Sequence, residues 1–195
     1  MPLRLHVILC STRPGRVGAT IAHWFHGLAT GHGTFDAKLV DIAAFNLPVY
    51  DEPRHPVLQQ YEHDHTKRWA ASVEAADAYV FVAPEYNHGP TPALVNALNY
   101  VYKEWNHKPA AFVGYGGASG GMRGVLATKP ILNTLKMVPI VEAVMIPMVT
   151  KHLDENRQFR PEDVHTSSAL TMLDELLRWA EALKPMRGPA GPASA

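Results

Sequence analysis

The feature that most constrains the fold of this chain is a set of short apolar runs in which polar and apolar residues do not alternate. Such runs are typical of strands buried on both faces, as in a parallel sheet. Amphipathic helical patterns separate them, and this alternation predicts a doubly wound α/β fold. We therefore expect a five-stranded parallel sheet with helices on both faces. The expected strands are residues 3–10, 38–42, 79–83, 110–115 and 140–149.

Helices are predicted where apolar residues recur every three or four positions. The segment 123–137 gives no clear prediction, because Pro130 would break or kink a helix there. The last helix has a clear start, since Pro161 suits a first-turn position and Glu162 and Asp163 suit the positive helix end. The predicted buried faces are Ile21, Phe25 and Leu28; Trp69, Val73 and Ala76; Leu94, Leu98 and Val101; and Leu173, Leu176, Ala180 and Leu183.

Length and charge limit the domain count and the partners. The 195 residues, 47% hydrophobic, suit a single domain over residues 1–184, followed by a flexible Pro-, Gly- and Ala-rich tail over residues 185–195. Lys plus Arg and Asp plus Glu both number 18, so no net charge attracts nucleic acid or a membrane surface. The sequence shows neither a secretory signal nor a membrane span, and Cys10 is the single cysteine. We expect a cytoplasmic protein without nucleic-acid or membrane partners.

The loop between the first strand and the first helix, residues 10–18, is a candidate phosphate site. Ligands of open α/β sheets bind beyond the carboxyl ends of the strands, and the N–H groups at a helix start suit a phosphate. Ser11, Arg13 and Arg16 can add hydrogen bonds to phosphate oxygens. The loop contains neither Gly-Lys-Ser/Thr nor G-x-G-x-x-G, which excludes the usual triphosphate and dinucleotide motifs. A solvated turn with two surface arginines is the alternative.

The same loop also resembles that of the low-molecular-weight tyrosine phosphatases. Cys10 and Arg16 have the C-x5-R spacing that places a thiolate beneath a bound phosphate. However, Pro14 removes one amide N–H from the loop, Val17 replaces the usual Ser or Thr, and the sequence lacks the Asp-Pro of the general acid. We therefore interpret Cys10 as a buried packing residue and keep the phosphatase as a weaker alternative.

Two further loops follow predicted strands at the same sheet edge. PEYN at 84–87 offers an acid, an aromatic ring and an amide, which suit the face and edge of a flat heterocycle. Packing by Tyr86 and helix capping by Asn87 are alternatives. The run YGGASGG at 115–121 allows backbone N–H groups to approach a ligand closely, with a merely flexible loop as the alternative.

STRPGR at 11–16, PEYN at 84–87 and YGGASGG at 115–121 together resemble the NADPH-dependent FMN reductases, a flavodoxin-like family that includes quinone, azo-dye and chromate reductases. The resemblance covers residues 3–183. It implies a flavodoxin-like FMN-binding domain, FMN as cofactor and NADPH or NADH as co-substrate. The FMN-binding residues that it implies are Ser11, Arg13, Arg16, Val17 and Gly18 at the phosphate, Pro84, Glu85, Tyr86 and Asn87 at the ring, and Gly116, Ser119 and Gly120 at its pyrimidine side.

The implied activity is electron transfer from NAD(P)H through FMN to a small acceptor such as a quinone, azo compound, free flavin or chromate. The cofactor carries such chemistry, so no residue is assigned as a catalytic acid or base. After PEYN the chain departs from the family with HGPTP at 88–92, which bears on the choice of acceptor. The family implies a homodimer or homotetramer. A flavodoxin-type electron carrier without its own NAD(P)H activity is an alternative, although zero net charge suits a basic partner poorly.

Three other features leave alternatives open. The Pro-containing connection 43–65 is long enough for a lid, a binding loop or a subunit contact, or is disordered. Trp105, with Tyr100 and Tyr102, suits a subunit contact, a pocket wall or core packing. EHDH at 62–65 contains metal-ligand types, but neighbouring side chains point in different directions. We therefore expect a solvated polar loop there and no metal site.

Overall fold

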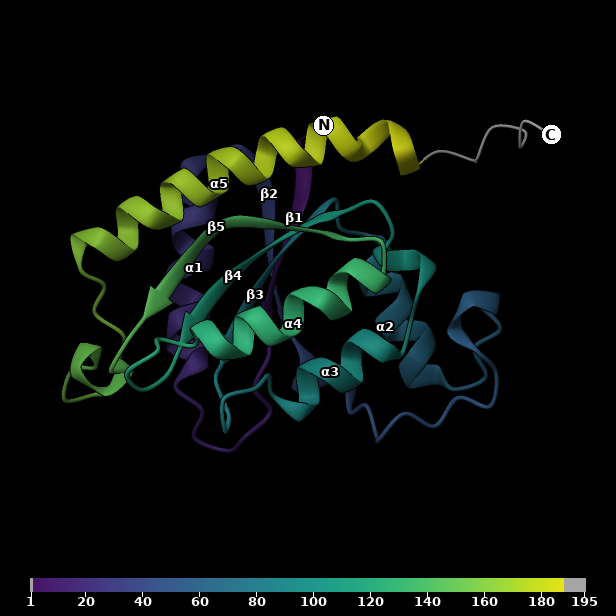
Figure 1. Cartoon of the computed structure of the whole chain (residues 1–195), viewed down its shortest axis with the longest axis horizontal. Coiled ribbons are helices and arrows are strands. Elements are labelled where there is room, and N and C mark those ends of the chain that lie inside the picture. The colour runs from purple at the N-terminus through teal and green to yellow at the C-terminus, as the bar shows by residue number, and fades with distance from the viewer. Residues whose placement is uncertain (1, 188–195) are drawn as a thin grey trace.

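The computed structural model describes residues 2–187, and this part of the chain forms a five-stranded parallel sheet with strand order β2-β1-β3-β4-β5 (Figure 1). This is the flavodoxin-like order, so the predicted fold class is confirmed. β2 begins earlier than expected, and a register shift interrupts the β4–β5 pairing between Ala110 and Phe112. The strands are β1 (Leu3–Leu9), β2 (Phe35–Asp41), β3 (Ala78–Pro84), β4 (Pro109–Tyr115) and β5 (Val138–Ile146).

Helices cover both faces of the sheet (Figure 1). α1 (Gly18–His32) and α5 (Asp163–Leu183) pack on one face, while α2 (Asp64–Glu74), α3 (Pro92–Asn99) and α4 (Met122–Thr134) pack on the other. Short 3-10 helices lie in the connections. They are η1 (Ile42–Phe45), η2 (Pro56–Leu58), η3 (Lys103–Trp105), η4 (Val149–His152) and η5 (Lys184–Arg187).

Two apolar cores follow from this layering. On the α1/α5 face, Phe25 and Leu173 pack with strand residues such as Val7, and all three are fully buried. On the opposite face, Trp69 and Leu98 belong to the second core. The predicted helix faces are buried except for Leu28 and Leu183, which are half-buried. The helical periodicity therefore predicted the inward faces correctly.

The segment that gave no clear prediction is helical. Pro130 lies inside α4 and is exposed, so the helix continues through it on its solvent side. Pro161 lies outside α5, which begins at Asp163, and the capping box at the helix start is formed by Glu162 and His165. The expected first-turn position of Pro161 is therefore wrong by two residues.

The long connection is ordered rather than disordered. It contains η1 and η2, and the buried carboxylate of Glu52 accepts hydrogen bonds from the amides of Glu62 (2.9 Å) and His63 (3.0 Å). The aromatic cluster belongs to the core, because Tyr100 and Trp105 are fully buried. Among residues 2–187, no group of three or more His, Cys, Asp or Glu side chains is arranged to hold a metal ion.

The ordered chain extends into the region expected to be a flexible tail. Residues 185–187 belong to η5, and Arg187 forms an ion pair with Asp77, with 2.6 Å between Nη1 and Oδ1. This contact joins η5 to the residue before β3, and the flexibility of the tail stays a prediction. The rest of that expectation, residues 188–195, lies outside the described residues. No described helix is both long and apolar enough to cross a membrane.

Candidate functional site

The three loops singled out in the sequence meet at the carboxyl edge of β1, β3 and β4. The hydroxyls of Ser11 and Tyr86 are 2.9 Å apart and share a hydrogen bond, which joins the first loop to the second. The amide of Glu85 donates to the carbonyl of Tyr115 (3.0 Å), which joins the second loop to the third. The strand order reverses beside β1, where ligands of this fold bind. The three segments that the sequence analysis singled out therefore lie together in the structure, and their part in binding stays a prediction.

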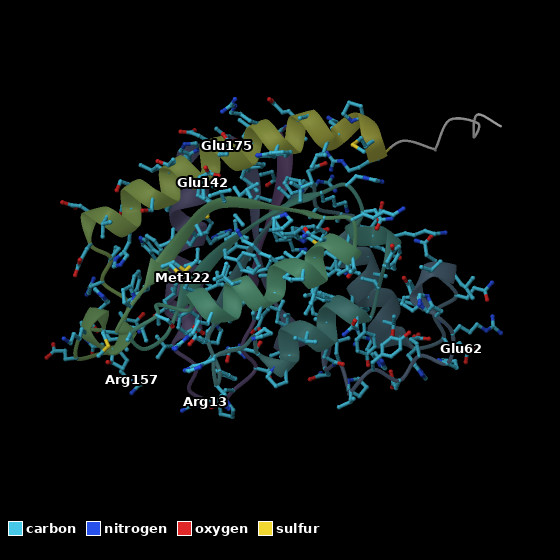
Figure 2. The ribbon with its side chains drawn as sticks, viewed as in Figure 1. Arg13, Glu62, Met122, Glu142, Arg157 and Glu175 are labelled. Atoms are coloured by element: carbon cyan, nitrogen blue, oxygen red, sulfur yellow. The ribbon has the colours of Figure 1, made fainter. Side chains whose placement is uncertain are left out.

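The first loop leaves a helix start open for an anion. Val17 precedes α1 and contributes no side-chain cap, and the first turn of α1 contains no acidic residue. Gly18 is buried so closely against the Tyr115 hydroxyl that a β-carbon would clash with it. Arg13 is exposed at the rim of the molecule (Figure 2). The uncapped N–H groups and Arg13 together suit a phosphate.

Arg16 has a partner that sequence reasoning missed. Its guanidinium forms an ion pair with Asp41, the last residue of β2. Asp41 also accepts a hydrogen bond from the amide of Ala43 (3.0 Å) and caps η1. The only signal in the sequence was an acidic residue at the end of an edge strand. In this structure Arg16 therefore links the first loop to β2.

Cys10 does not have the environment of a nucleophile. It is fully buried, and its thiol donates to the carbonyl of Ile8 (3.2 Å). Burial raises the pKa of this thiol well above its ordinary value, although a backbone hydrogen bond to Val82 acts in the opposite direction. Thiolate chemistry needs the opposite shift. The structure therefore argues against the phosphatase alternative and supports the packing role.

The second loop is a tight two-residue turn. Tyr86 and Gly89 exchange backbone hydrogen bonds of 3.0 and 2.9 Å, and Asn87 and His88 between them both have positive φ, 48° and 67°. Positive φ at both central positions is typical of a type I′ turn. Asn87 is exposed and does not cap α3. The turn presents Asn87 and His88 outward at the mouth of the site.

Thr91 caps α3 instead of Asn87. Its hydroxyl accepts from the amide of Leu94 (3.1 Å) and donates to the carbonyl of Cys10 (2.7 Å). Thr91 is buried, so this pair of bonds fixes the start of α3 to the end of β1. Sequence reasoning missed Thr91, although a Thr followed by Pro92 is a common helix start.

The third loop needs glycine at its end. Gly120 and Gly121 have φ of 63° and 93°, and a β-carbon on Gly121 would lie 2.5 Å from the amide nitrogen of Tyr115. Gly116 lies against Glu85, with 3.6 Å between its β-carbon position and Cβ of Glu85. The loop backbone can therefore fold back closely over the edge of β4. Ser119 donates its hydroxyl to Glu85 (2.7 Å).

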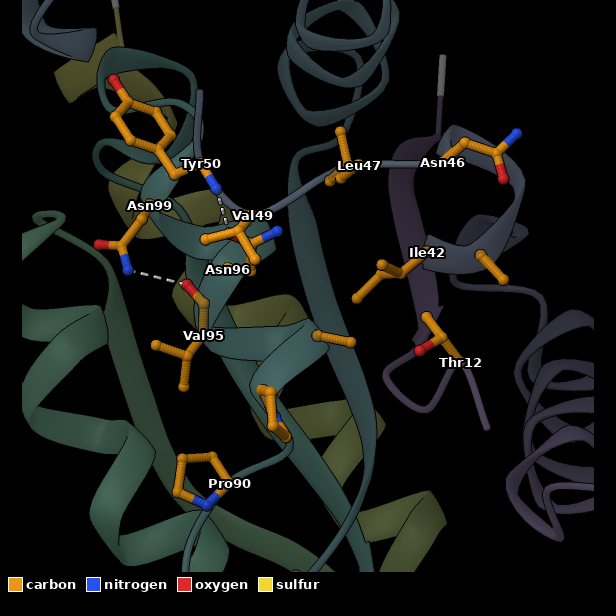
Figure 3. Close-up of a pocket in the computed structure, with 13 residues that line it drawn as sticks. Thr12, Ile42, Asn46, Leu47, Val49, Tyr50, Pro90, Val95, Asn96 and Asn99 are labelled. Atoms are coloured by element: carbon orange, nitrogen blue, oxygen red, sulfur yellow. Dashed lines mark hydrogen bonds between the residues drawn. The ribbon is translucent and has the colours of Figure 1, made fainter. Parts of the chain in front are cut away.

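A cavity of about 890 Å³ lies beside the first loop, and sequence reasoning did not predict it. Thr12, η1 and α3 form its walls (Figure 3). Asn96 holds one wall: its amide donates to the carbonyl of Pro48 (2.6 Å) and accepts from the amide of Tyr50 (2.9 Å). Its lining contains no charged side chain and consists of Thr12, Ile42, Ala43, Asn46, Leu47, Val49, Tyr50, Pro90, Pro92, Ala93, Val95, Asn96 and Asn99.

The family model for NADPH-dependent FMN reductases matches residues 3–151 of the chain, which include all three loops. The chain belongs to the NADPH-dependent FMN reductase family. An NAD(P)H-dependent FMN reductase of Schizosaccharomyces pombe is 39% identical over 170 residues, 78% of this chain and 84% of that protein. One of Nectria sp is 35% identical over 150 residues, 74% of this chain and 75% of that protein.

A solved structure has the same flavodoxin-like fold. FerB, a flavoenzyme NAD(P)H:(acceptor) oxidoreductase from Paracoccus denitrificans, superposes with a TM-score of 0.74 at 19% identity. The match covers 92% of this chain and 98% of FerB. At 19% sequence identity, the similarity to FerB is evidence for the fold alone. The open helix start, the outward turn and the glycine loop suit the phosphate and the flat ring of FMN.

Proposed function

We propose that this protein is an FMN-dependent NAD(P)H oxidoreductase that passes electrons to a small, uncharged, flat acceptor such as a quinone. The observation that carries this proposal is the meeting of the three loops, joined by the Ser11–Tyr86 and Glu85–Tyr115 hydrogen bonds. When bound, FMN would supply the transfer of electrons from the nicotinamide to the acceptor. The chain's own residues bind and orient the reactants.

The residues of each loop have separate parts in this proposal. Ser11, Arg13 and the amides from Arg16 to Gly18 hold the phosphate, because they combine a cation with the positive end of α1. Arg16 contributes through its amide, since its guanidinium is paired with Asp41. The flavin ring lies between two sets of residues: Pro84, Tyr86 and Asn87 on one side, and the backbone of Gly116, Ser119 and Gly120 on the other.

The cavity beside the first loop supports an uncharged acceptor. Its lining combines aliphatic and proline side chains with three asparagines and no charged group. An apolar wall with a few amides suits a flat ring with carbonyl oxygens, whereas a highly charged acceptor such as chromate finds no counter-charge there. We place the acceptor between this cavity and the exposed Asn87 and His88.

Assembly and location belong to the same proposal. We propose a homodimer or homotetramer in the cytoplasm. The nearly fully exposed Val49 (88%) and the exposed Leu58 (54%) in segment 46–63 support an apolar contact with a second copy. Light scattering on the purified protein measures the assembly, and a monomer at all concentrations contradicts this part.

The decisive experiment compares FMN with riboflavin, which lacks the phosphate. The protein with FMN should oxidise NADPH when a benzoquinone is added, whereas a flavodoxin-type carrier would not. Arg13→Gln should weaken FMN binding about tenfold and leave riboflavin binding unchanged, because only FMN offers the phosphate. Flavin fluorescence quenching measures both affinities.

Arg68→Gln, an exposed arginine on α2, is the matched control and should change neither affinity. Two results would contradict the proposal. One is NADPH oxidation that does not depend on FMN. The other is equal loss of FMN and riboflavin binding in Arg13→Gln.

A further inference from the structure

Glu85 is the most heavily hydrogen-bonded carboxylate at the site. Its side chain is only 6% exposed, directly after β3. It accepts from the Ser119 hydroxyl (2.7 Å), from the Arg123 amide (3.0 Å) and from Arg123 Nε (2.7 Å), and Arg123 Nη2 lies 2.6 Å from its Oε1. The Gly124 amide lies 3.4 Å from Oε2. All of these donors belong to the third loop or to the first turn of α4.

These contacts supply the cap that α4 does not provide for itself. Gly121 precedes the helix and has no side chain to accept from the first-turn amides. Glu85 supplies the missing capping group from a neighbouring loop. Its Oε2 accepts from the amides of Arg123 and Gly124, the second and third residues of α4, which are the usual partners of a capping side chain. A carboxylate at this end also interacts favourably with the helix dipole.

The carboxylate remains ionised over the whole neutral range. Burial opposes its ionisation, but the hydrogen bonds from Arg123, Ser119 and the α4 amides outweigh burial and lower the pKa of Glu85 to about 2. A group with this pKa does not exchange a proton with a reactant near neutral pH. Glu85 therefore has no acid or base part in the reaction.

The same contacts join the two loops that enclose the proposed ring site. The Pro84–Gly89 turn carries Glu85, whereas the Gly116–Gly121 loop carries Ser119 and leads into Arg123. Glycine-rich backbone has many accessible conformations unless something restricts it. Because Ser119 donates its hydroxyl to Glu85, that hydroxyl restrains the loop, and the backbone of the loop is the part available to the flavin.

We propose that Glu85 is a positioning residue for the flavin, one that holds the Pro84–Gly89 turn and the Gly116–Gly121 loop at a fixed separation through Ser119 and Arg123. It acts through these partners and does not contact the reacting atoms. This inference rests on the proposed placement of FMN between the two loops. It assigns Glu85 and Ser119 a different part from the direct flavin contact that the family resemblance implied.

The test compares Glu85→Gln with Glu155→Gln, an exposed glutamate that takes no part in these contacts. Glutamine keeps the size of Glu85 but places an NH₂ group against the Arg123 and Ser119 donors. In Glu85→Gln we expect about tenfold weaker FMN binding, an altered visible spectrum of the bound flavin and, at saturating FMN, a lower kcat with little change in KM for NADPH. Glu155→Gln should match the unaltered protein in all three.

A second variant keeps the test decisive if Glu85→Gln does not fold. Arg123→Met removes the guanidinium donors but leaves the α4 amides and Glu85 in place, and it should shift the flavin spectrum in the same direction. A lower melting temperature with unchanged FMN affinity and spectrum would show that Glu85 only caps α4 and would overturn the inference.

The Arg13→Gln arm separates the two proposals. If Arg13→Gln weakens FMN binding and Glu85→Gln does not, only this inference fails. If neither change affects FMN binding, the placement of FMN at this edge fails and the inference fails with it.

Discussion

The buried ammonium group of Lys108 has two opposing effects. Its hydrogen bonds satisfy carbonyls at the end of α2, but its burial lowers the stability of the folded state while the group is charged. Lys108 is 4% exposed and donates to the carbonyls of Val73 and Glu74, both at 3.1 Å, at the end of α2. The same ammonium group donates a third hydrogen bond to the hydroxyl of Tyr79 (3.3 Å). Burial is the main cause that lowers the pKa of Lys108 from 10.5 to about 8, against the attraction of Glu74.

This depressed pKa predicts a rise in stability with pH. Between pH 8 and 10.5 the unfolded chain keeps the Lys108 proton that the folded chain has released, so the free energy of unfolding increases with pH. Relative to Lys108→Met, the unaltered protein should gain about 1 kcal/mol per pH unit between pH 8 and 9.5, since the folded-state lysine is still half protonated at pH 8. Urea unfolding of both proteins measures the difference. Exposed Lys151→Met is the control, and parallel profiles for all three proteins would contradict the prediction.

At the scale of elements, the strands and helix faces were predictable because burial on both faces leaves uninterrupted apolar runs and one-sided burial leaves helical periodicity. The ion pairs between distant side chains were not predictable from the sequence. Arg123 lies 38 positions after Glu85, and Asp41 lies 25 positions after Arg16, with no local pattern connecting the two members of either pair. Such pairs depend on the sheet order, which brings distant strand ends together. α4 escaped prediction for another reason: tertiary packing outweighed the unfavourable proline.

Pro130 offers a test of that unfavourable effect. Proline lacks the N–H that would bond to the carbonyl four residues earlier, and it is exposed, so replacing it leaves no cavity. Pro130→Ala should raise the free energy of unfolding by about 1–3 kcal/mol. Pro161→Ala, outside a helix, should instead lower it by up to about 1 kcal/mol, because the unfolded chain gains freedom. Chemical denaturation measures both, and equal changes of the same sign would count against this account of α4.

At the scale of the whole molecule, the two edges of the sheet have separate tasks. The carboxyl edge carries the three loops of the proposed FMN site. At the opposite edge, Asp77 accepts from the amide of Arg4 (2.8 Å) and pairs with Arg187, which joins the start of β1 to the chain beyond α5. These contacts hold the two ends of the described chain on the same scaffold without approaching the site.

A change at Asp77 should therefore affect stability alone. Asp77→Asn removes the charge of a mostly buried pair, and we expect a loss of about 1–2 kcal/mol in the free energy of unfolding. The FMN affinity should stay the same. Asp64→Asn is the control, because Asp64 is largely exposed and its pair with Lys67 contributes little. A change in FMN affinity in Asp77→Asn would show that the two edges are coupled.

Because Cys10 is buried, the reactivity of its thiol can be used to measure how often the core of the protein opens. The sequence has one cysteine, and its fully buried thiol lies at the end of a central strand. A thiol reagent can reach it only when the sheet and its helices separate, so the labelling rate follows the opening equilibrium of the core. For the same reason, a cysteine introduced on the surface can carry a dye or a spin label without background from the native thiol.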